Sequence, residues 1–280
     1  MLVTRLAPTP SGYLHLGNVV NLILTSWWAR AQRGRLLLRI DDFDTTRERP
    51  EYLADVFDTL DWLGIRPDAG PVGPEDFRDH WSMRLRTTAF RAAAHRLHAD
   101  HPALVFACGC SRRELRDGFC VAGCRTGGMD LTAGRNALRL HVPPGLTVSP
   151  GEGPQAADVW TVPPGDHVLW RRDDLPAYLL GSVLVDEELG VTGVLRGADL
   201  LPSSALQLHL ARLLPAPGFA AADLRHHALL PAPDGGKLSK SAGAQAMPLV
   251  RSDDLRAHAE RIATELGEGV AVSWCGPRRS

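Results

Sequence analysis

Apolar positions near the start of the chain follow two different periods. Residues 2–7 (LVTRLA) and 36–40 (LLLRI) are short apolar runs of strand length. Between them, residues 18–31 (NVVNLILTSWWARA) repeat apolar side chains at the spacing of an amphipathic to buried helix. A strand, a helix and a second strand in this order predict the opening of an α/β fold built on a Rossmann-like, doubly wound parallel sheet.

The rest of the chain continues this alternation, with one interruption. Helical patterns cover residues 50–64, 82–100, 203–214 and 252–266. Strand-like runs are ALRLHV (137–142), HVLWRR (167–172), LLGSVLV (179–185) and GVTGVLRGADLL (190–201). Residues 108–165 instead combine a cysteine cluster with many glycines and prolines. We therefore expect an inserted module at 108–165 that divides the α/β domain into residues 1–107 and 166–280.

Length and composition exclude a disordered chain and give no membrane signal. With 280 residues, 44% of them hydrophobic, the chain can bury the core of one elaborated domain or of two smaller ones. The start, MLVTRLAPTPSG, lacks an apolar stretch of signal-peptide length, and no run of about 18 apolar residues follows, so we expect a cytoplasmic protein. No coiled-coil pattern is present, which makes a monomer the default expectation.

The net charge gives no overall attraction to nucleic acid. The formal charge is −1 and the pI is about 6.8, so a polyanionic partner has to be bound by local basic patches. Two patches occur, and each is equally consistent with RNA contact and with ordinary solvated helix surface. The first contains Arg84, Arg86, Arg91 and Arg96, and the second contains Arg112, Arg113, Arg116 and Arg125.

Four of the five cysteines lie close together in the sequence. They are Cys108, Cys110, Cys120 and Cys124, and the fifth, Cys275, is remote. Two disulfides are disfavoured in a reducing cytoplasm, whereas a CxC pair followed by a Cx3C pair offers four thiolates on two short turns. We expect a structural Zn²⁺ site, because four thiolates leave no open position for water. Unligated core thiols are the alternative.

Two lysines stand out because every other basic residue, histidine apart, is arginine. The chain has 31 Lys plus Arg, and only Lys237 and Lys240 are lysines. A compact ammonium group on a flexible stem can follow a phosphate as its geometry changes, which a planar guanidinium does less well. The pair therefore predicts contact with a phosphate that moves during a reaction. A chance pair on an exposed loop, after the turn at Asp234 to Gly236, is the alternative.

A second anion site is expected where the first strand passes to the first helix. His15 and Gly17 lie at this junction, where backbone N–H groups and the helix dipole favour an anion. Gly12 and Gly17 allow a planar ring or a phosphate to approach the backbone closely. An HxG motif alone is weak evidence, but here it is matched by the late Lys-Leu-Ser-Lys-Ser.

These motifs together resemble those of a known enzyme family. PTPSGYLHLGN is similar to the HIGH signature and KLSKS to the KMSKS signature of class I aminoacyl-tRNA synthetases. RLAPTPSGYLHLGN, LLRIDDFDTTR, AYLLGSVLVDEELGVTGVLRGADLL and GGKLSKS are together similar to the glutamate branch of that class. The resemblance covers nearly the whole chain.

The resemblance implies two-step chemistry. A glutamate carboxylate attacks the α-phosphate of ATP, pyrophosphate leaves, and an RNA hydroxyl then takes the glutamyl group. The protein's part in such a reaction is mostly alignment and charge stabilisation. The resemblance assigns the catalytic role to His15, Lys237 and Lys240. It assigns ATP, accompanied by Mg²⁺, to Gly12, His15, Gly17, Asn18 and Lys240.

The resemblance also implies a glutamate site. Its residues would be Arg5, Leu6, Ala7, Pro8, Thr9, Asp41, Tyr178 and Arg196. The two arginines suit a carboxylate through the bidentate geometry of guanidinium. Alternatively, an arginine at a strand end pairs with a neighbouring acid, and Tyr178 is a core aromatic. The glutamate branch usually has RIED where this chain has RIDD, and the glutamine branch has a similar Asp, so Asp41 leaves glutamine open as the substrate.

The length after the second signature narrows the resemblance. The 39 residues that follow Ser241 are too few for the helical anticodon-binding domain of glutamyl-tRNA synthetases. The chain therefore resembles the truncated glutamyl-queuosine tRNA(Asp) synthetase family, which attaches glutamate to the queuosine base. In that family the zinc module has CxC followed by Yx3C, so Cys120 stands where tyrosine is frequent. The implied partners are ATP, L-glutamate and queuosine-containing tRNA(Asp).

Two other interpretations remain at this point. The chain could activate glutamate for a different acceptor, such as a tRNA 3′ end, a small molecule or a carrier protein. It could also be a catalytically silent relative that binds RNA or nucleotide for regulation. The presence of His15, Lys237 and Lys240 argues against silence, because a chain released from catalysis could exchange lysine for arginine.

Overall fold

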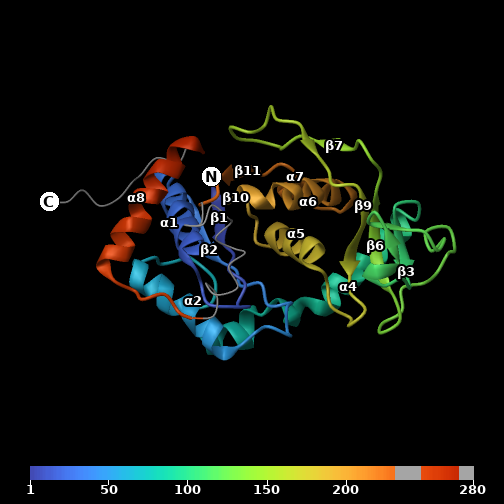
Figure 1. The fold of residues 1–280 in the computed structure, drawn as a ribbon, viewed down its shortest axis with the longest axis horizontal. Helices are drawn as coiled ribbons and strands as arrows, with labels where there is room; N and C mark the ends of the chain where they lie inside the picture. Colours follow the sequence, from blue (N-terminus) through green and yellow to red (C-terminus); the bar gives the residue numbers. More distant parts are fainter. Residues whose placement is uncertain (231–246, 271–280) are drawn as a thin grey trace.

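The computed structural model describes residues 1–230 and 247–270 (Figure 1). Its first elements are β1 (Val3–Leu6), α1 (Leu16–Ala31) and β2 (Arg35–Leu38). β1 and β2 are parallel, with Val3 opposite Arg35, which confirms the predicted β-α-β opening. Leu36 and Leu38 belong to one core cluster and Leu37 to another. Since successive strand side chains point to opposite faces, both faces of this sheet are covered.

The second half of the parallel arrangement follows late in the chain. β10 (Gly193–Gly197) and β11 (Asp223–His227) are parallel, and α6 (Leu201–Leu213) lies between them in sequence. The backbone N–H of Thr192 donates to the carbonyl of Val3 at 2.8 Å, so β10 runs beside β1. The chain leaves β1 toward β2 on one side and leaves β10 toward β11 on the other. The carboxyl ends of β1 and β10 therefore form a topological switch point, where ligands bind in open α/β sheets.

Helices cover both faces. α1 packs against α8 (Asp253–Gly269) through a cluster that includes Val20, Leu24, Ala259 and Ala263. In Figure 1 these two helices lie together at one end of the molecule, near α2 (Pro50–Leu63). The predicted helices at 50–64 and 252–266 are thus confirmed. On the other side, α5 (Tyr178–Glu188), α6 and α7 (Pro217–Ala220) share a core with α4 (Thr87–Asp100).

The predicted strand at 179–185 is wrong, because these residues belong to α5. A short apolar run looks alike in a buried strand and in a helix that is buried on several sides. α5 contacts α6, α7 and β9, and its buried residues include Gly181, Val183 and Asp186. A Cβ on Gly181 would come within 2.4 Å of the Phe43 ring, so this helix sits close to the segment after β2.

A separate antiparallel sheet spans the predicted insert and the residues on either side of it. Its strands are β3 (Val105–Cys108), β6 (Ala137–Val142) and β9 (Gly165–Trp170), in the order β3-β6-β9. Figure 1 shows this sheet at the end of the molecule opposite α8. Two hairpins accompany it, β4 (Leu115–Arg116) with β5 (Phe119–Cys120), and β7 (Thr147–Val148) with β8 (Trp160–Thr161). The outer strands β3 and β9 flank the predicted insert, which they enter only at Cys108 and Gly165. The three-part division at 107 and 165 stays a prediction.

The remaining elements are short. They are α3 (Pro74–Asp76), a π-helical turn (Phe77–Trp81) and three 3₁₀ turns (Met83–Arg86, Arg112–Glu114 and Ala198–Leu200). The predicted helix at 82–100 therefore begins as a 3₁₀ turn and becomes α-helical at Thr87. Within residues 1–230 and 247–270, no helix has both the length and the apolar character that crossing a bilayer requires.

Candidate active site

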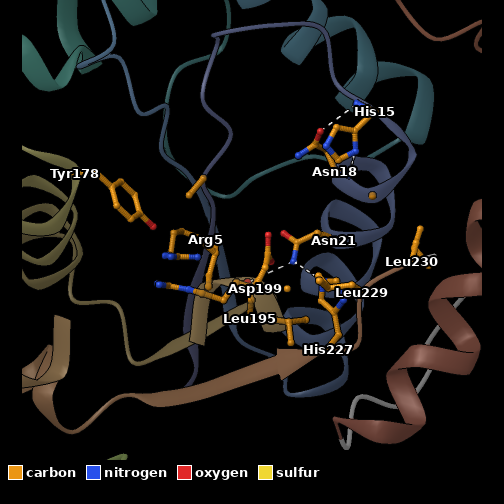
Figure 2. A pocket seen from close by; sticks show the side chains of 15 residues that line it. Arg5, His15, Asn18, Asn21, Tyr178, Leu195, Asp199, His227, Leu229 and Leu230 are labelled. Carbon is orange, nitrogen blue, oxygen red and sulfur yellow. Dashed lines mark hydrogen bonds between the residues drawn. The ribbon is translucent and has the colours of Figure 1, made fainter. Parts of the chain in front are cut away.

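The carboxyl ends of β1 and β10 open into a cavity of about 240 Å³ (Figure 2). We call it the switch-point cavity, because it lies where the connections of the sheet diverge. Its walls come from β1, the start of α1, α5, β10 and the segment after β11. The lining residues are Arg5, Ala7, His15, Gly17, Asn18, Asn21, Tyr178, Leu195, Arg196, Gly197, Asp199, Leu200, His227, Leu229 and Leu230.

A second cavity, of about 290 Å³, lies under the loop between β1 and α1. We call it the loop cavity. It shares Ala7, Asn18, Tyr178 and Leu200 with the switch-point cavity, so the two adjoin. Its other lining residues are Pro8, Thr9, Ser11, Gly12, Tyr13, Leu14 and Asp41. All the predicted catalytic, glutamate-binding and ATP-binding residues that the structure describes, except Leu6, thus line one cavity or the other.

Leu6 faces away from both cavities. Its side chain is 1% exposed and packs in the core with Leu22 and Leu53. The reason is strand alternation, since Arg5 points to one face of β1 and Leu6 to the other. The structure therefore does not support a side-chain contact between Leu6 and a ligand in either cavity.

His15 begins helix α1 and is held by that helix. Its Nδ1 accepts a hydrogen bond from the backbone N–H of Asn18 at 3.4 Å, and its own N–H donates to Asn18 Oδ1 at 3.0 Å. Burial lowers the pKa of His15, and the nearby Asp199 only partly opposes this. A neutral ring that accepts through Nδ1 carries its proton on Nε2, so His15 can donate one hydrogen bond to a ligand.

Gly17 leaves the space that the imidazole occupies. A Cβ at this position would lie 3.0 Å from Cε1 and 3.1 Å from Nδ1 of His15. A larger residue would therefore push the ring away from the helix start. Gly12 lies in the wall of the loop cavity, where the absence of a side chain keeps the backbone accessible.

Arg196 is a buried cation that no carboxylate of residues 1–230 and 247–270 neutralises directly. It is 4% exposed and donates to Gln207 Oε1 at 2.6 Å and to Ser204 Oγ at 3.3 Å, both through Nη1. Its Nη2 is buried and has no hydrogen-bond partner. Within the described part of the chain, no acidic oxygen lies within 4.0 Å of it, so the alternative of a structural ion pair does not apply to Arg196.

Arg5 belongs to a buried ion-pair chain that the sequence did not reveal. Its Nε donates to both oxygens of Asp186, at 3.2 and 3.1 Å. Arg39 pairs with Asp186 at 2.5 Å and binds Asp41 in a bidentate manner, at 2.8 and 3.0 Å. Burial alone would raise the pKa of Asp186, but Arg39 and Arg5 outweigh it and hold that pKa below its ordinary value. The alternative of an ion-paired arginine thus applies to Arg5, although its terminal nitrogens have no partner among the described residues.

The buried arginines beside the switch-point cavity outnumber the carboxylates of their cluster. Among the described residues, Arg5, Arg39 and Arg196 are grouped with two carboxylates, those of Asp41 and Asp186, so this cluster has one positive charge in excess. A third carboxylate, that of Asp199, also lines the cavity, where it acts on His15 and His227. Burial, together with the neighbouring cations, lowers the pKa of Arg196. A ligand anion beside Arg196 would relieve this unfavourable state, because it would supply the missing negative charge in a low-dielectric environment.

Tyr178 lies at the border of the two cavities. It is the first residue of α5 and is 39% exposed, which excludes the alternative of a core aromatic. Figure 2 shows its ring extending from α5 toward Arg5, with the hydroxyl at the near end. The hydroxyl can therefore reach a ligand that is held between α5 and β1.

Several lining residues were missed in the sequence. Asn21 lies one helical turn after Asn18 and donates to His227 Nε2 at 3.2 Å. His227 Nδ1 in turn donates to the carbonyl of Ala228 at 2.8 Å, so this ring is neutral and oriented. The sequence could have indicated His227 by its position, because a polar residue at the carboxyl end of β11 has to lie near the switch point. The other lining residues of the switch-point cavity that were missed are Leu195, Gly197, Asp199, Leu200, Leu229 and Leu230.

Lys237 and Lys240 lie outside the described residues. Their neighbours on both sides are described and connect to the site. Leu230 lines the switch-point cavity. After this segment, Arg251 forms an ion pair with Asp55, whose second oxygen accepts the N–H of Leu14 at 2.8 Å. Leu14 directly precedes His15, so the chain on the far side of the lysine segment is anchored next to the first signature.

The four clustered cysteines converge at the opposite end of the molecule. All four Sγ atoms lie within 4.8 Å of one another, and Cys110 Sγ is 3.6 Å from Cys120 Sγ and 3.8 Å from Cys124 Sγ. Sulfurs at the corners of a tetrahedron around Zn²⁺, with bonds of about 2.3 Å, are about 3.8 Å apart. The thiols are free, which excludes disulfides between them, and their geometry fits one tetrahedral metal ion.

A tight hairpin places Cys120 in this cluster. β4 and β5 are joined by Asp117 and Gly118, with φ values of 50° and 85°, which is the two-residue turn that an Asp-Gly pair favours. The Asp-Gly pair was the signal in the sequence that could have located this hairpin. The N–H of Cys120 donates to Asp166 Oδ2 at 2.6 Å, so β9 helps to orient this ligand.

Comparisons with known proteins agree with this geometry. Residues 1–96 match the family model described as the catalytic domain of class I tRNA synthetases (E and Q). A glutamyl-Q tRNA(Asp) synthetase of Verminephrobacter eiseniae is 37% identical, over 96% of this chain and 93% of its own length. The protein of the same name from Pseudomonas paraeruginosa is 36% identical, over 97% of this chain and 91% of its own.

Solved structures show the same fold. A glutamate-tRNA synthetase of Elizabethkingia anophelis superposes with a TM-score of 0.66 at 24% identity, over 86% of this chain and 53% of that one. A glutamate tRNA ligase of Elizabethkingia meningosepticum, in complex with its amino acid, gives 0.65 at 22% identity, over 89% and 54%. This chain spans about half the length of these two proteins. By sequence relationship over nearly its whole length, the chain belongs to the glutamyl-Q tRNA(Asp) synthetase family of class I synthetases.

Proposed function

We propose that this chain activates L-glutamate with ATP and transfers the glutamyl group to the queuosine base of tRNA(Asp). Its relatives carry the name of that activity and match it over more than nine tenths of both lengths. The glutamate carboxylate attacks the α-phosphate of ATP, pyrophosphate leaves, and a hydroxyl of queuosine displaces AMP from the glutamyl carbonyl. The protein contributes mainly alignment and charge stabilisation to these steps.

One observation carries the choice of glutamate. Among the residues that the structure describes, the buried Arg196 has no carboxylate partner and its Nη2 has no hydrogen-bond partner. The cluster that it forms with Arg5, Arg39, Asp41 and Asp186 has one positive charge in excess. At neutral pH glutamate has a net charge of −1 and glutamine is neutral. The difference between them is the side-chain carboxylate of glutamate. Arg196 and the free terminal nitrogens of Arg5 would bind that side-chain carboxylate, with the Tyr178 hydroxyl as a further donor.

Asp41 would bind the substrate ammonium from the loop cavity. Both of its oxygens already accept hydrogen bonds from Arg39, but carboxylate oxygens have further lone pairs. Asp41, the residue that left glutamine possible as the substrate in the sequence, is therefore held in place by the guanidinium of Arg39. The uncompensated Arg196 on the other side favours glutamate, because a neutral amide would leave that cation without a counter-charge.

ATP would lie against the start of α1. The neutral His15 would donate through Nε2 to a phosphate oxygen, and Gly17 and Asn18 would line the nucleotide's path. Asn21 and His227 would orient the base or ribose in the same cavity. Lys237 and Lys240 would stabilise the charge on the α-phosphate and on the leaving pyrophosphate, and Mg²⁺ would accompany the nucleotide.

We propose Zn²⁺ as the ion of the cysteine cluster. The Sγ distances fit four bonds to zinc, and four sulfur ligands leave no position for water, so the role would be structural. Burial and the neighbouring thiols raise the pKa of Cys110, and a bound dication would favour its thiolate. A cytoplasmic location is consistent with four thiols that have to stay reduced.

The RNA would approach the second basic patch. In the first patch, Arg84, Arg86 and Arg91 are held by ion pairs with acidic residues of the protein. In the second patch, all four arginines are exposed, and no acidic group of the described chain lies within 4.0 Å of them: Arg112, Arg113, Arg116 and Arg125. Exposed guanidinium groups without acidic partners are suited to RNA phosphates, and binding to them should weaken with salt.

One experiment tests the proposed function. The protein is incubated with ATP and labelled glutamate or glutamine, with total tRNA from cells that make queuosine and from cells that do not. We expect label from glutamate only in the queuosine-containing tRNA(Asp). Equal labelling of unmodified tRNA would contradict the acceptor. Pyrophosphate exchange with glutamate but no labelled tRNA would mean that the activated glutamate goes to a different acceptor.

A further inference from the structure

Gln207 lies directly behind Arg196 and is completely buried. Its side chain is 0% exposed, and its Oε1 accepts from Arg196 Nη1 at 2.6 Å. Gln207 comes from α6, whereas Arg196 comes from the end of β10, so the contact is made by tertiary packing. Nη2 of Arg196 has no partner among the described residues, so it is available to bind a ligand.

The neighbouring hydroxyl decides which way the amide of Gln207 points. Ser182 Oγ donates to the carbonyl of Tyr178, one turn earlier in α5, at 2.6 Å. Its hydrogen is therefore used, and it accepts from Gln207 Nε2 at 2.6 Å. With the NH₂ group committed to Ser182, the amide oxygen has to face Arg196. The orientation follows from hydrogen-bond direction and needs no charge.

We propose that Gln207 determines the preference for a substrate with an anionic side chain, because its neutral amide orients Arg196 without neutralising it. A carboxylate at the same distance would pair with the guanidinium and remove the excess positive charge of the cluster. The site would then hold a neutral side chain, such as the amide of glutamine, as well as an anionic one. This inference rests on the proposed activation of glutamate.

The test compares Gln207→Glu with Gln207→Met. The two variants have nearly the size of glutamine, but only the first adds a charge. Pyrophosphate exchange is measured with glutamate and with glutamine, and kcat/KM is determined for each. In Gln207→Glu we expect the ratio of the glutamate to the glutamine value to fall about 100-fold. In Gln207→Met both values should fall, but their ratio should stay within about fivefold of that of the unmodified chain.

Three outcomes would overturn the inference. The first is an unchanged ratio in folded Gln207→Glu, with folding verified by thermal unfolding. The second is a ratio that falls equally in both variants, which would mean that orientation matters and neutrality does not. The third applies if Gln207→Glu does not fold. In that case a loss of the glutamate preference in Gln207→Met would overturn the inference, because methionine is as neutral as glutamine. Failure of the unmodified chain to exchange pyrophosphate with glutamate would contradict the proposed function instead.

Discussion

Arg251 forms an ion pair with Asp55, and the other oxygen of that carboxylate accepts the backbone N–H of Leu14 at 2.8 Å. One buried side chain of α2 thus connects the residue before His15 with the chain that follows the lysine segment. Asp55 therefore links the residue before the first signature to a residue that follows the second signature in sequence. The relative position of His15 and the segment that carries Lys240 should therefore depend on Asp55.

Asp55→Ala should lower both stability and activity. It leaves the Leu14 N–H and the Arg251 guanidinium without a partner, which should cost about 3 kcal/mol of unfolding free energy. Glutamate-dependent pyrophosphate exchange should fall about tenfold. Asp58→Ala is the matched control, since Asp58 is 4.0 Å from Arg251 and its side chain is 66% exposed. Equal effects of the two substitutions, in denaturant unfolding and exchange assays, would show that the anchor has no special role.

His15→Asn should separate catalysis from folding. Asparagine is a good N-cap, so the start of α1 should survive and the melting temperature should change by only a few degrees. The ring nitrogen that would face a phosphate is lost, and glutamate activation should fall about 100-fold. A variant with normal kcat for pyrophosphate exchange would remove His15 from the mechanism.

Lys240→Arg should preserve folding and lower glutamate activation about 100-fold. The charge is kept, but a planar fork replaces the compact ammonium group that has to follow the phosphate. Arg125→Lys is the control for the reverse exchange. Arg125 is exposed and is assigned to RNA contact, not to ATP or glutamate. Normal pyrophosphate exchange by Lys240→Arg would refute the interpretation of the two lysines.

Cys124→Ser should remove the bound metal and loosen residues 108–125. Zinc binding is coupled to local folding, so amide hydrogen exchange should increase in the hairpin that carries Cys120. Metal content is measured by elemental analysis. Cys275→Ser, at the remote cysteine, is the control and should keep one zinc per chain. Unchanged metal content in Cys124→Ser would mean that this cluster is not the zinc site.

His226 should make stability fall below neutral pH. Burial, followed by the nearby Arg196 and His227, lowers the pKa of His226 from its ordinary value of 6.5 to about 3. Between these values the unfolded chain binds more protons than the folded one, so acid favours unfolding. At pH 5 this group should cost about 2 kcal/mol relative to pH 7. The free energy of unfolding is measured with denaturant at both pH values. Between pH 7 and pH 5 it should fall by about 2 kcal/mol less in His226→Gln than in the unmodified chain, and an equal fall in both would contradict the role of His226.

Local patterns predicted much of the fold. Residues 2–7 and 18–31 were predictable because strand and helix periods differ clearly there, and the structure has β1 and α1 at those positions. LLGSVLV was predicted wrongly, because a short apolar run does not distinguish a buried strand from the multiply packed helix α5. The outer strands β3 and β9 pair with β6 across a long segment, and no local pattern specifies such pairing.

Within the candidate site, residue types were predictable and charge balance was not. The sequence motifs pointed to Arg5, His15, Asp41 and Arg196, which all line the two cavities. Arg5 and Arg196 looked equivalent in the sequence. The structure distinguishes them, since Arg5 pairs with Asp186 and Arg196 with the neutral Gln207. Asp186 lies 181 residues from Arg5, directly after the apolar run at 179–185, so nothing local marked it as the partner of Arg5.

The sequence by itself determined the family motifs, the opening strand, helix and strand, and the four thiols on two short turns, because these depend on residue type and short spacing. Only the tertiary structure decided which cation remains uncompensated, through the burial of Arg196 against Gln207 and of Arg5 against Asp186. The physical reason is that electrostatic energy depends on distance and on exclusion of water. Both are set by packing between segments that are remote in the chain.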